Sequence, residues 1–271
     1  MCTFYWSQCG KINVYAKRRG TQEWTDKMAD LFCVKLGETM RGTFAEHVKQ
    51  YAYGEALLVL PNRFLLQSEQ QKGTVRAVNM DYLPNEILRA NRRDRFEMLS
   101  RRSQEIIVKK LIDDKKKAGQ LKYLLNIADA DSFAKIVTGF IGELSRAGTT
   151  AEEFAEAVSA WERKNGYGLK DEEIASIYTD YRKVLKKNNW YDIDGLYRLA
   201  TIELQKAGSI IPWQALFFSD FYQFDHLQLG LIAAIKDRCT VSIGIVGDMK
   251  NDELYGATLN TIGDLLGCGF K

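Results

Sequence analysis

Short apolar runs alternate with amphipathic stretches in the first third of the chain. The apolar runs predict strands at 31–36, 56–60 and 74–78, and helical periodicity predicts helices at 43–53 and 63–71. Strands that alternate with helices in this way are typical of an α/β protein with a parallel sheet.

The hydrophobic pattern changes between residues 94 and 207, where strand signals vanish. Ile177, Tyr181 and Leu185 recur at four-residue steps and therefore predict one buried helix face. Thr150 and Glu153 have the spacing of a capping box, and we expect Asp192 to cap a later helix. This stretch predicts an all-helical domain of about 110 residues.

Strand signals return near the C-terminus, at 214–218 and 240–246, with a helix predicted at 226–236 between them. We therefore expect a discontinuous α/β domain, residues 30–93 and 208–271, interrupted by the helical insertion 94–207. Residues 1–29 show no clear periodicity, and we leave this N-terminal extension unassigned.

Composition indicates an ordinary soluble globular protein. Hydrophobic residues make up 46% of the chain and charged residues 27%, and a net charge of +3 neither requires nor excludes nucleic acid. Five scattered cysteines do not complete a zinc-binding spacing. With no apolar run of about 18 residues and no signal-peptide pattern, we expect a cytoplasmic protein that does not contact a membrane.

A glycine-rich turn follows the first predicted strand. Gly37, Gly42 and Thr43 resemble parts of a P-loop, which cradles nucleotide phosphates and binds magnesium through its hydroxyl. The P-loop lysine is missing because Thr43 follows Gly42 directly, and Arg41 is a cation next to the required position. Two interpretations stay open: a weak or vestigial site for ATP and Mg²⁺, and a turn that binds nothing.

The strand predicted at 214–218 ends on Ser219 and Asp220. In motor ATPases two acids at such a strand end orient magnesium and activate water. If Ser219 fills the first place, a neutral hydroxyl replaces a charged ligand and magnesium affinity should fall. Alternatively, Asp220 caps the following helix, and both roles can hold together.

The next predicted strand ends in Gly247 and Asp248. In motor domains such a segment senses the terminal phosphate, whereas a Gly-Asp pair after a strand is also typical of a simple turn.

Basic residues gather near the junction of the two predicted domains and along the first long helix. They are Arg89, Arg92, Arg93 and Arg95, followed by Lys115, Lys116 and Lys117. Such a stripe can follow a nucleic-acid backbone, and it can equally be a solvated helix face.

Four ordered segments together resemble one known family. They are 56–62, 74–83, 177–185 with 192–194 after it, and 219–228, and the last contains Ser219, Asp220, Phe221, Tyr222, Phe224 and Gln228. The tail 253–261 also resembles the family's segment beyond that strand. In this order they resemble the amino-terminal part of the AddB/RexB subunit of bacterial ATP-dependent helicase–nucleases. More distantly they resemble the UvrD-like superfamily 1 helicases. The resemblance covers roughly residues 30–271.

This resemblance implies a RecA-like (P-loop NTPase-like) domain with a helical 1B-type insertion. It implies a role in processing double-strand DNA ends for recombinational repair, with DNA ends or single strands and an AddA-like helicase–nuclease subunit as partners. The family's second RecA-like domain and nuclease domain lie beyond this chain, so their metal carboxylates and iron–sulfur cysteines are not transferred to it.

Three functional hypotheses follow. The missing P-loop lysine and Ser219 favour a helicase-like module that does not hydrolyse ATP, guides DNA and docks its partner. The alternatives are the ATP-binding half of a motor that needs an absent second domain, and a protein-interaction scaffold with no role on DNA.

Overall fold

The computed structural model of the chain describes residues 29–93, 95–166, 168–248 and 251–271. These residues divide into two compact units. The first holds the described residues up to Asn91, together with Glu203–Phe224 and Leu229–Lys271, and the second holds Arg92–Ile202 with Asp225–Gln228. The predicted N-terminal extension lies outside the described residues, apart from Ala29.

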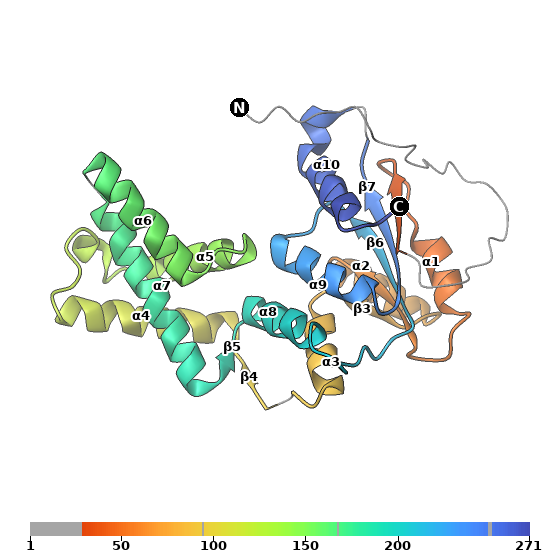
Figure 1. Cartoon of the computed structure of the whole chain (residues 1–271), viewed down its shortest axis with the longest axis horizontal. Helices are drawn as coiled ribbons and strands as arrows, with labels where there is room; N and C mark the ends of the chain where they lie inside the picture. The colour runs from red at the N-terminus through yellow and green to blue at the C-terminus, as the bar shows by residue number, and fades with distance from the viewer. Residues whose placement is uncertain (1–28, 94, 167, 249–250) are drawn as a thin grey trace. The chain divides into compact units, whose positions relative to one another are not determined.

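The first unit is built on a five-stranded sheet, which confirms the predicted α/β class (Figure 1). Its order is β1-β7-β6-β2-β3, with β1 at Ala29–Val34, β2 at Ala56–Leu60, β3 at Ala77–Asn79, β6 at Ala215–Phe221 and β7 at Thr240–Val246. Every pair in it is parallel. The carboxyl ends of all five strands therefore meet at one edge.

Helices cover both faces of this sheet. They are α1 (Arg41–Val48), α2 (Arg63–Lys72), α3 (Tyr82–Ala90), α9 (His226–Lys236) and α10 (Asp252–Gly267). On one face, Phe44 and Val48 of α1 pack with Leu58 and Phe217. On the other, Phe218 contacts Phe224, whose amide donates to the Thr261 hydroxyl of α10. Successive strand residues alternate between faces, and the neighbours Phe217 and Phe218 do so here.

Several predicted elements have shifted ends. The strands predicted at 31–36 and 214–218 are β1 and β6, at Ala29–Val34 and Ala215–Phe221. The helix predicted at 43–53 is α1, which begins earlier because the Thr39 hydroxyl accepts from the Arg41 amide, 3.0 Å. It ends at Val48, where a turn closes with the Tyr51 amide bonded to the Val48 carbonyl. The strand predicted at 74–78 is β3, which begins at Ala77.

The second unit is mainly helical (Figure 1). It contains α4 (Arg101–Lys117), a short 3₁₀ turn (Leu125–Ile127), α5 (Asp131–Arg146), α6 (Ala151–Asn165), α7 (Leu169–Asn188) and most of α8 (Ile193–Leu204). A two-stranded pair, β4 (Glu97–Met98) and β5 (Trp190–Tyr191), lies beside them. The core includes Val108, Ile112, Ile177 and Tyr181. The capping box at Thr150 and Glu153 is present as predicted.

A buried carboxylate fixes the start of α8. Asp192 accepts the Gly195 amide at 2.7 Å and the Tyr181 hydroxyl at 3.0 Å, and Arg182 lies 3.4 Å away. The predicted capping role of Asp192 is therefore confirmed. Asp194 is also buried, and burial, reinforced by the Asp192 carboxylate, raises its pKa to about 7.

In the part of the chain that the structure describes, the helices are all too short or too polar to cross a membrane.

The raised pKa of Asp194 predicts a pH-dependent stability. The folded state holds the proton more tightly than the unfolded state, so this group's contribution falls as pH rises from about 4 to about 7. Asparagine cannot ionise, so Asp194→Asn should not show this loss. Between pH 4 and pH 8, the free energy of unfolding of Asp194→Asn should increase by on the order of 2–4 kcal/mol relative to that of the unchanged chain. Urea unfolding at both pH values measures it. The control is Asp114→Asn, at an exposed position, for which no such change is expected. The prediction is refuted if the difference in free energy of unfolding between Asp194→Asn and the unchanged chain is the same at both pH values.

Candidate nucleotide site

The glycine-rich turn sits at the carboxyl end of β1 and before α1, as the P-loop pattern requires. Gly37 adopts a left-handed conformation, φ 88°. Gly42 and Thr43 lie inside the first turn of α1 and are exposed. No atom lies within 4 Å of a Cβ placed on Gly42, so no close backbone approach at this position requires glycine.

Arg41 joins this turn to two carboxylates. Its Nε lies 3.4 Å from Glu69 Oε1 of α2 and 3.5 Å from Asp220 Oδ2 of β6. Glu69 is only 2% exposed and also accepts from Lys72 at 2.6 Å. We call Arg41, Glu69 and Asp220 the arginine bridge. Arg41, the cation next to the position where a P-loop has its lysine, is thus paired with carboxylates of the protein itself.

Ser219 and Asp220 lie where β6 leaves regular pairing with β7. The register shifts between Phe218 and Phe221, and Asp220 takes a left-handed conformation with φ 63°. Few non-glycine residues adopt this conformation, and the bulge re-aims the side chain at the end of the strand. Ser219 is fully buried, and its hydroxyl donates to Asp220 Oδ2 at 3.1 Å.

The alternative that Asp220 caps the next helix is wrong. Helix α9 begins at His226, and Asp225 accepts the Gln228 amide at 2.8 Å. Asp220 lies within β6 and is turned toward Arg41 instead.

Gly247 and Asp248 follow β7 in a turn. The Gly247 amide donates to the Val34 carbonyl, and a Cβ at Gly247 would come within 2.9 Å of Thr258 Cγ2 of α10. The Asp248 carbonyl accepts from the Asn251 amide, which opens α10. Asp248 is exposed. Burial raises the pKa of the Cys33 thiol, and the negative charge of Asp248 raises it further. Packing against α10 accounts for the glycine without a phosphate.

The predicted site residues differ in burial and in pairing. Ser219 is neutral and buried, Asp220 is paired with a guanidinium, and Thr43 is on the helix surface. Among the described residues there is no group of three His, Cys, Asp or Glu side chains that could hold a metal.

The predicted basic stripe is not continuous. Arg92, Arg93 and Arg95 are exposed, and Arg89 is 69% exposed beside Glu86. Lys115, however, is buried: its ammonium donates to Ser176 and Asp180, each at 2.6 Å. Lys116 pairs with Asp129 at 2.5 Å, whereas Lys117 is exposed. Lys115 is therefore a structural residue of the second unit and does not lie on its surface.

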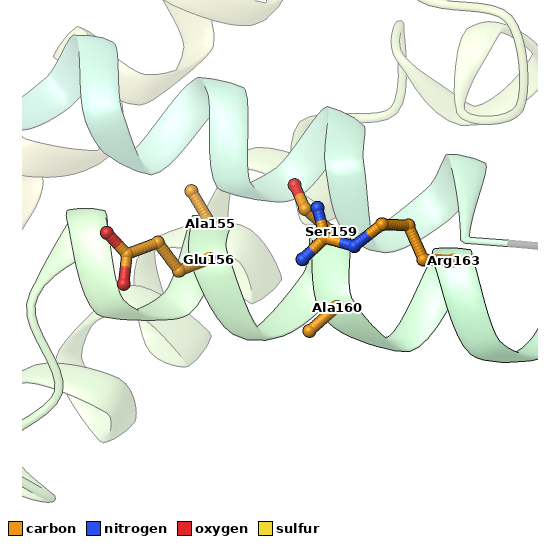
Figure 2. A pocket seen from close by; sticks show the side chains of 5 residues that line it. All are labelled: Ala155, Glu156, Ser159, Ala160 and Arg163. Atoms are coloured by element: carbon orange, nitrogen blue, oxygen red, sulfur yellow. The ribbon is translucent and has the colours of Figure 1, made fainter.

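A hollow on α6 in the second unit also lacks the features of a site (Figure 2). Ala155, Ser159 and Ala160 line it, and Figure 2 shows the Glu156 carboxylate pointing away from the Arg163 guanidinium. Its polar groups do not converge on one point.

Sequence reasoning missed Glu69. Its spacing to Lys72 predicts a local ion pair. Nothing in the sequence of this short amphipathic helix indicates that Glu69 also contacts Arg41, which follows β1.

The architecture defines an α/β protein with a parallel sheet whose carboxyl edge carries the glycine-rich turn and Asp220. A comparison with family models places residues 44–266, well over half of the chain, in the family described as ADDB, N-terminal. The chain therefore belongs to this family and is an AddB-type subunit N-terminal region. Comparison with the curated proteins gave no significant match.

A packing role for Gly247 predicts a stability effect. Gly247→Ala should destabilise the chain by about 1–3 kcal/mol, because its Cβ would clash with Thr258 Cγ2. Adding Thr258→Ser, which removes that methyl group, should restore most of the loss. Gly42→Ala is the matched control and should be neutral or stabilising by up to about 1 kcal/mol, since the site is open and helical. Chemical denaturation measures all four proteins; an equal effect of the two alanines would contradict this role.

Proposed function

We propose that this chain is a helicase-like module of an AddB-type subunit that acts in double-strand-break repair without hydrolysing ATP. It guides DNA and docks an AddA-like partner subunit. Family membership supports the repair role. A parallel five-stranded sheet and a helical middle unit support a RecA-like domain with a 1B-type insertion.

The observation that carries this proposal is the arginine bridge. A P-loop enzyme needs a cation free to meet the phosphates and an acid free to orient magnesium. Here Arg41, the cation of the turn, lies against Glu69 and Asp220, so the cation and the acid neutralise each other. ATP would have to break this bridge, and Ser219 would give magnesium no charged ligand.

The DNA-guiding part of the proposal is supported by exposed cations at the start of the second unit. Arg92, Arg93 and Arg95 follow one another closely and are all exposed. Arginines in such an array contact phosphates without reading sequence.

Calorimetry with magnesium–ATP tests the nucleotide part of the proposal. We expect no binding at micromolar concentrations, because the bridge occupies the groups that ATP would need. Binding is a better readout than turnover, since superfamily 1 motors hydrolyse ATP between two domains. Micromolar binding that Thr43→Val abolishes would favour the alternative of a functional motor half and overturn this proposal.

DNA binding is tested by charge reversal. Arg92→Glu, Arg93→Glu and Arg95→Glu together should weaken single-strand binding and lower the slope of log K against log salt by about 0.7 per lost phosphate contact. Reversing Arg163, Lys164 and Lys170, three exposed cations elsewhere in the second unit, is the control with equal net charge. If both triple variants lose the same affinity for single-stranded DNA, the loss reflects net charge alone and contradicts a DNA contact at Arg92, Arg93 and Arg95. Absence of DNA binding by the unchanged chain at low salt would support a scaffold instead.

A further inference from the structure

Two guanidinium groups converge on one face of α5. A Cβ placed on Gly142 would lie 3.2 Å from Arg146 Nη1 and 3.6 Å from Arg101 Nη1. Arg146 follows Gly142 by four residues, so its side chain leans back over the glycine, whereas Arg101 reaches the same point from the start of α4. Both arginines are exposed. We call Arg101 and Arg146 the guanidinium pair.

Two glycines of α5 make this convergence possible. Gly139 and Gly142 lie inside the helix, three residues apart and therefore on one face, and a Cβ at Gly139 would lie 3.5 Å from Arg101 Nη2. Glycine is among the least favoured residues in a helix interior. Here its lack of a side chain leaves room for the guanidiniums to lie against the helix.

The start of α4 also departs from ordinary helix chemistry. Its first two residues are Arg101 and Arg102, and its first turn contains no acidic residue. The helix dipole places partial positive charge at this end, so cations there are normally disfavoured. Local rules broken in this way are typical of functional sites. The cations of α4 and the glycines of α5 break two such rules around the same guanidinium pair.

One carboxylate serves the two arginines of α4. Glu105 Oε1 lies 3.7 Å from Arg101 Nε, and its Oε2 lies 3.4 Å from Arg102 Nη1. The Arg101 Nη1 atom turns instead toward α5, where it donates to the Thr138 carbonyl at 3.4 Å. Glu105 therefore offsets only part of the positive charge at the start of α4.

Arg146 is compensated even less. Its side chain forms no hydrogen bond and no ion pair with any residue that the structure describes, the exposed Glu143 three residues earlier included. Asp194 attracts it at longer range, but burial raises the pKa of Asp194 to about 7, so near pH 7 much of this carboxyl is neutral. Lys135 is exposed and precedes Gly139 by four residues, so it adds a cation to the same face of α5.

An oxyanion is the ligand that this arrangement suits. Two guanidiniums that meet without a carboxylate between them repel each other, and an anion between them would remove the repulsion. The planar fork of N–H donors on arginine matches the oxygens of a phosphate group and binds them through charge-assisted hydrogen bonds. The chemistry of the guanidinium pair therefore points to phosphate.

The position of the pair favours a phosphate of nucleic acid. The exposed run Arg92, Arg93 and Arg95 belongs to the same unit, and the six residues from Arg95 to Arg101 span at most about 20 Å. Glu97, the acid between them, accepts from the Trp190 indole. One DNA strand is long enough to contact both groups of arginines.

We propose that the guanidinium pair binds a phosphate of the DNA backbone and extends the DNA contact of the second unit from Arg92, Arg93 and Arg95 onto α4 and α5. The inference rests on the proposed function, to which it adds a second contact on the DNA strand and the residues that form it. Because backbone phosphates are alike at every nucleotide, the pair adds affinity without reading sequence.

Fluorescence anisotropy of a labelled single-stranded oligonucleotide with the whole chain, over a series of salt concentrations, tests this inference. The pair variant, Arg101→Gln with Arg146→Gln, should bind roughly five-fold more weakly or worse. Because two arginines on one phosphate make one contact, the slope of log K against log salt should fall by about 0.7, and not by twice that amount. Arg163→Gln with Lys164→Gln removes the same charge from exposed positions of α6 and should change the affinity less than about two-fold.

Gly142→Leu tests the geometry without changing the net charge. Its side chain would occupy the space in which the two guanidiniums meet, so DNA binding should weaken although leucine is a good helix former. Gly263→Leu is the matched control and should bind as the unchanged chain does, because Gly263 lies inside α10 with nothing within 4 Å of its Cβ position. Thermal melts check that each variant is folded.

The inference is overturned, and the proposed function left standing, if the pair variant and Gly142→Leu bind the oligonucleotide normally while charge reversal of Arg92, Arg93 and Arg95 weakens binding. Equal losses in the pair variant and the α6 variant, with Gly142→Leu unaffected, would reduce the effect to net charge and also overturn it. Calorimetry with inorganic phosphate is the second probe: phosphate binding that needs the pair, with oligonucleotide affinity unchanged in the pair variant, would assign the pair to free phosphate instead. Absence of DNA binding by the unchanged chain at low salt would overturn both this inference and the DNA-guiding part of the proposed function.

Discussion

One guanidinium links three elements of the first unit at the carboxyl edge of its sheet. Arg41 opens α1 and lies against a carboxylate from α2 and another from the end of β6. Glu69 is almost fully buried, so a charge on it is tolerated only when cations stand beside it. Without Arg41, Glu69 would keep Lys72, but Asp220 would lose its cation in a strained left-handed turn. The bridge therefore ties the end of β6 to α1 and α2.

The bridge also lies where the sequence pattern predicts a nucleotide site. A glycine-rich turn, a strand-end acid and a second strand-end turn all lie at one edge of the sheet, as a nucleotide site requires. Two side chains of that pattern, Arg41 and Asp220, contact each other. In the second unit, buried Lys115 of α4 pairs with Asp180 of α7, and buried Glu173 accepts three successive amides of the segment that follows α4.

Much of the fold could be predicted because continuous apolar runs and clear helical periods specify elements directly. The strand at 240–246 and the helix at 226–236 have the predicted bounds. Element ends were less predictable at α1 and β3, where side-chain and turn hydrogen bonds decide the boundary.

The site was less predictable than the fold. The acid at Asp220 was visible in the sequence, but its partner Arg41 is distant along the chain, as is Glu69, which Arg41 also contacts. The three residues come together only through the parallel sheet. Lys115 shows the opposite case, because a signal existed. It follows Val108 and Ile112 at helical spacing and so belongs to the inner face of α4, although a run of three lysines suggested a solvated surface.

A double-mutant cycle between Arg41→Met and Asp220→Asn, measured by chemical denaturation, tests the central claim most directly. If the two side chains bind each other in the free chain, the losses of stability should be non-additive, with a favourable coupling of about 1 kcal/mol. Losses that add to within about 0.3 kcal/mol would show that the two residues act independently, and would contradict the account of a strand-end acid held by the arginine.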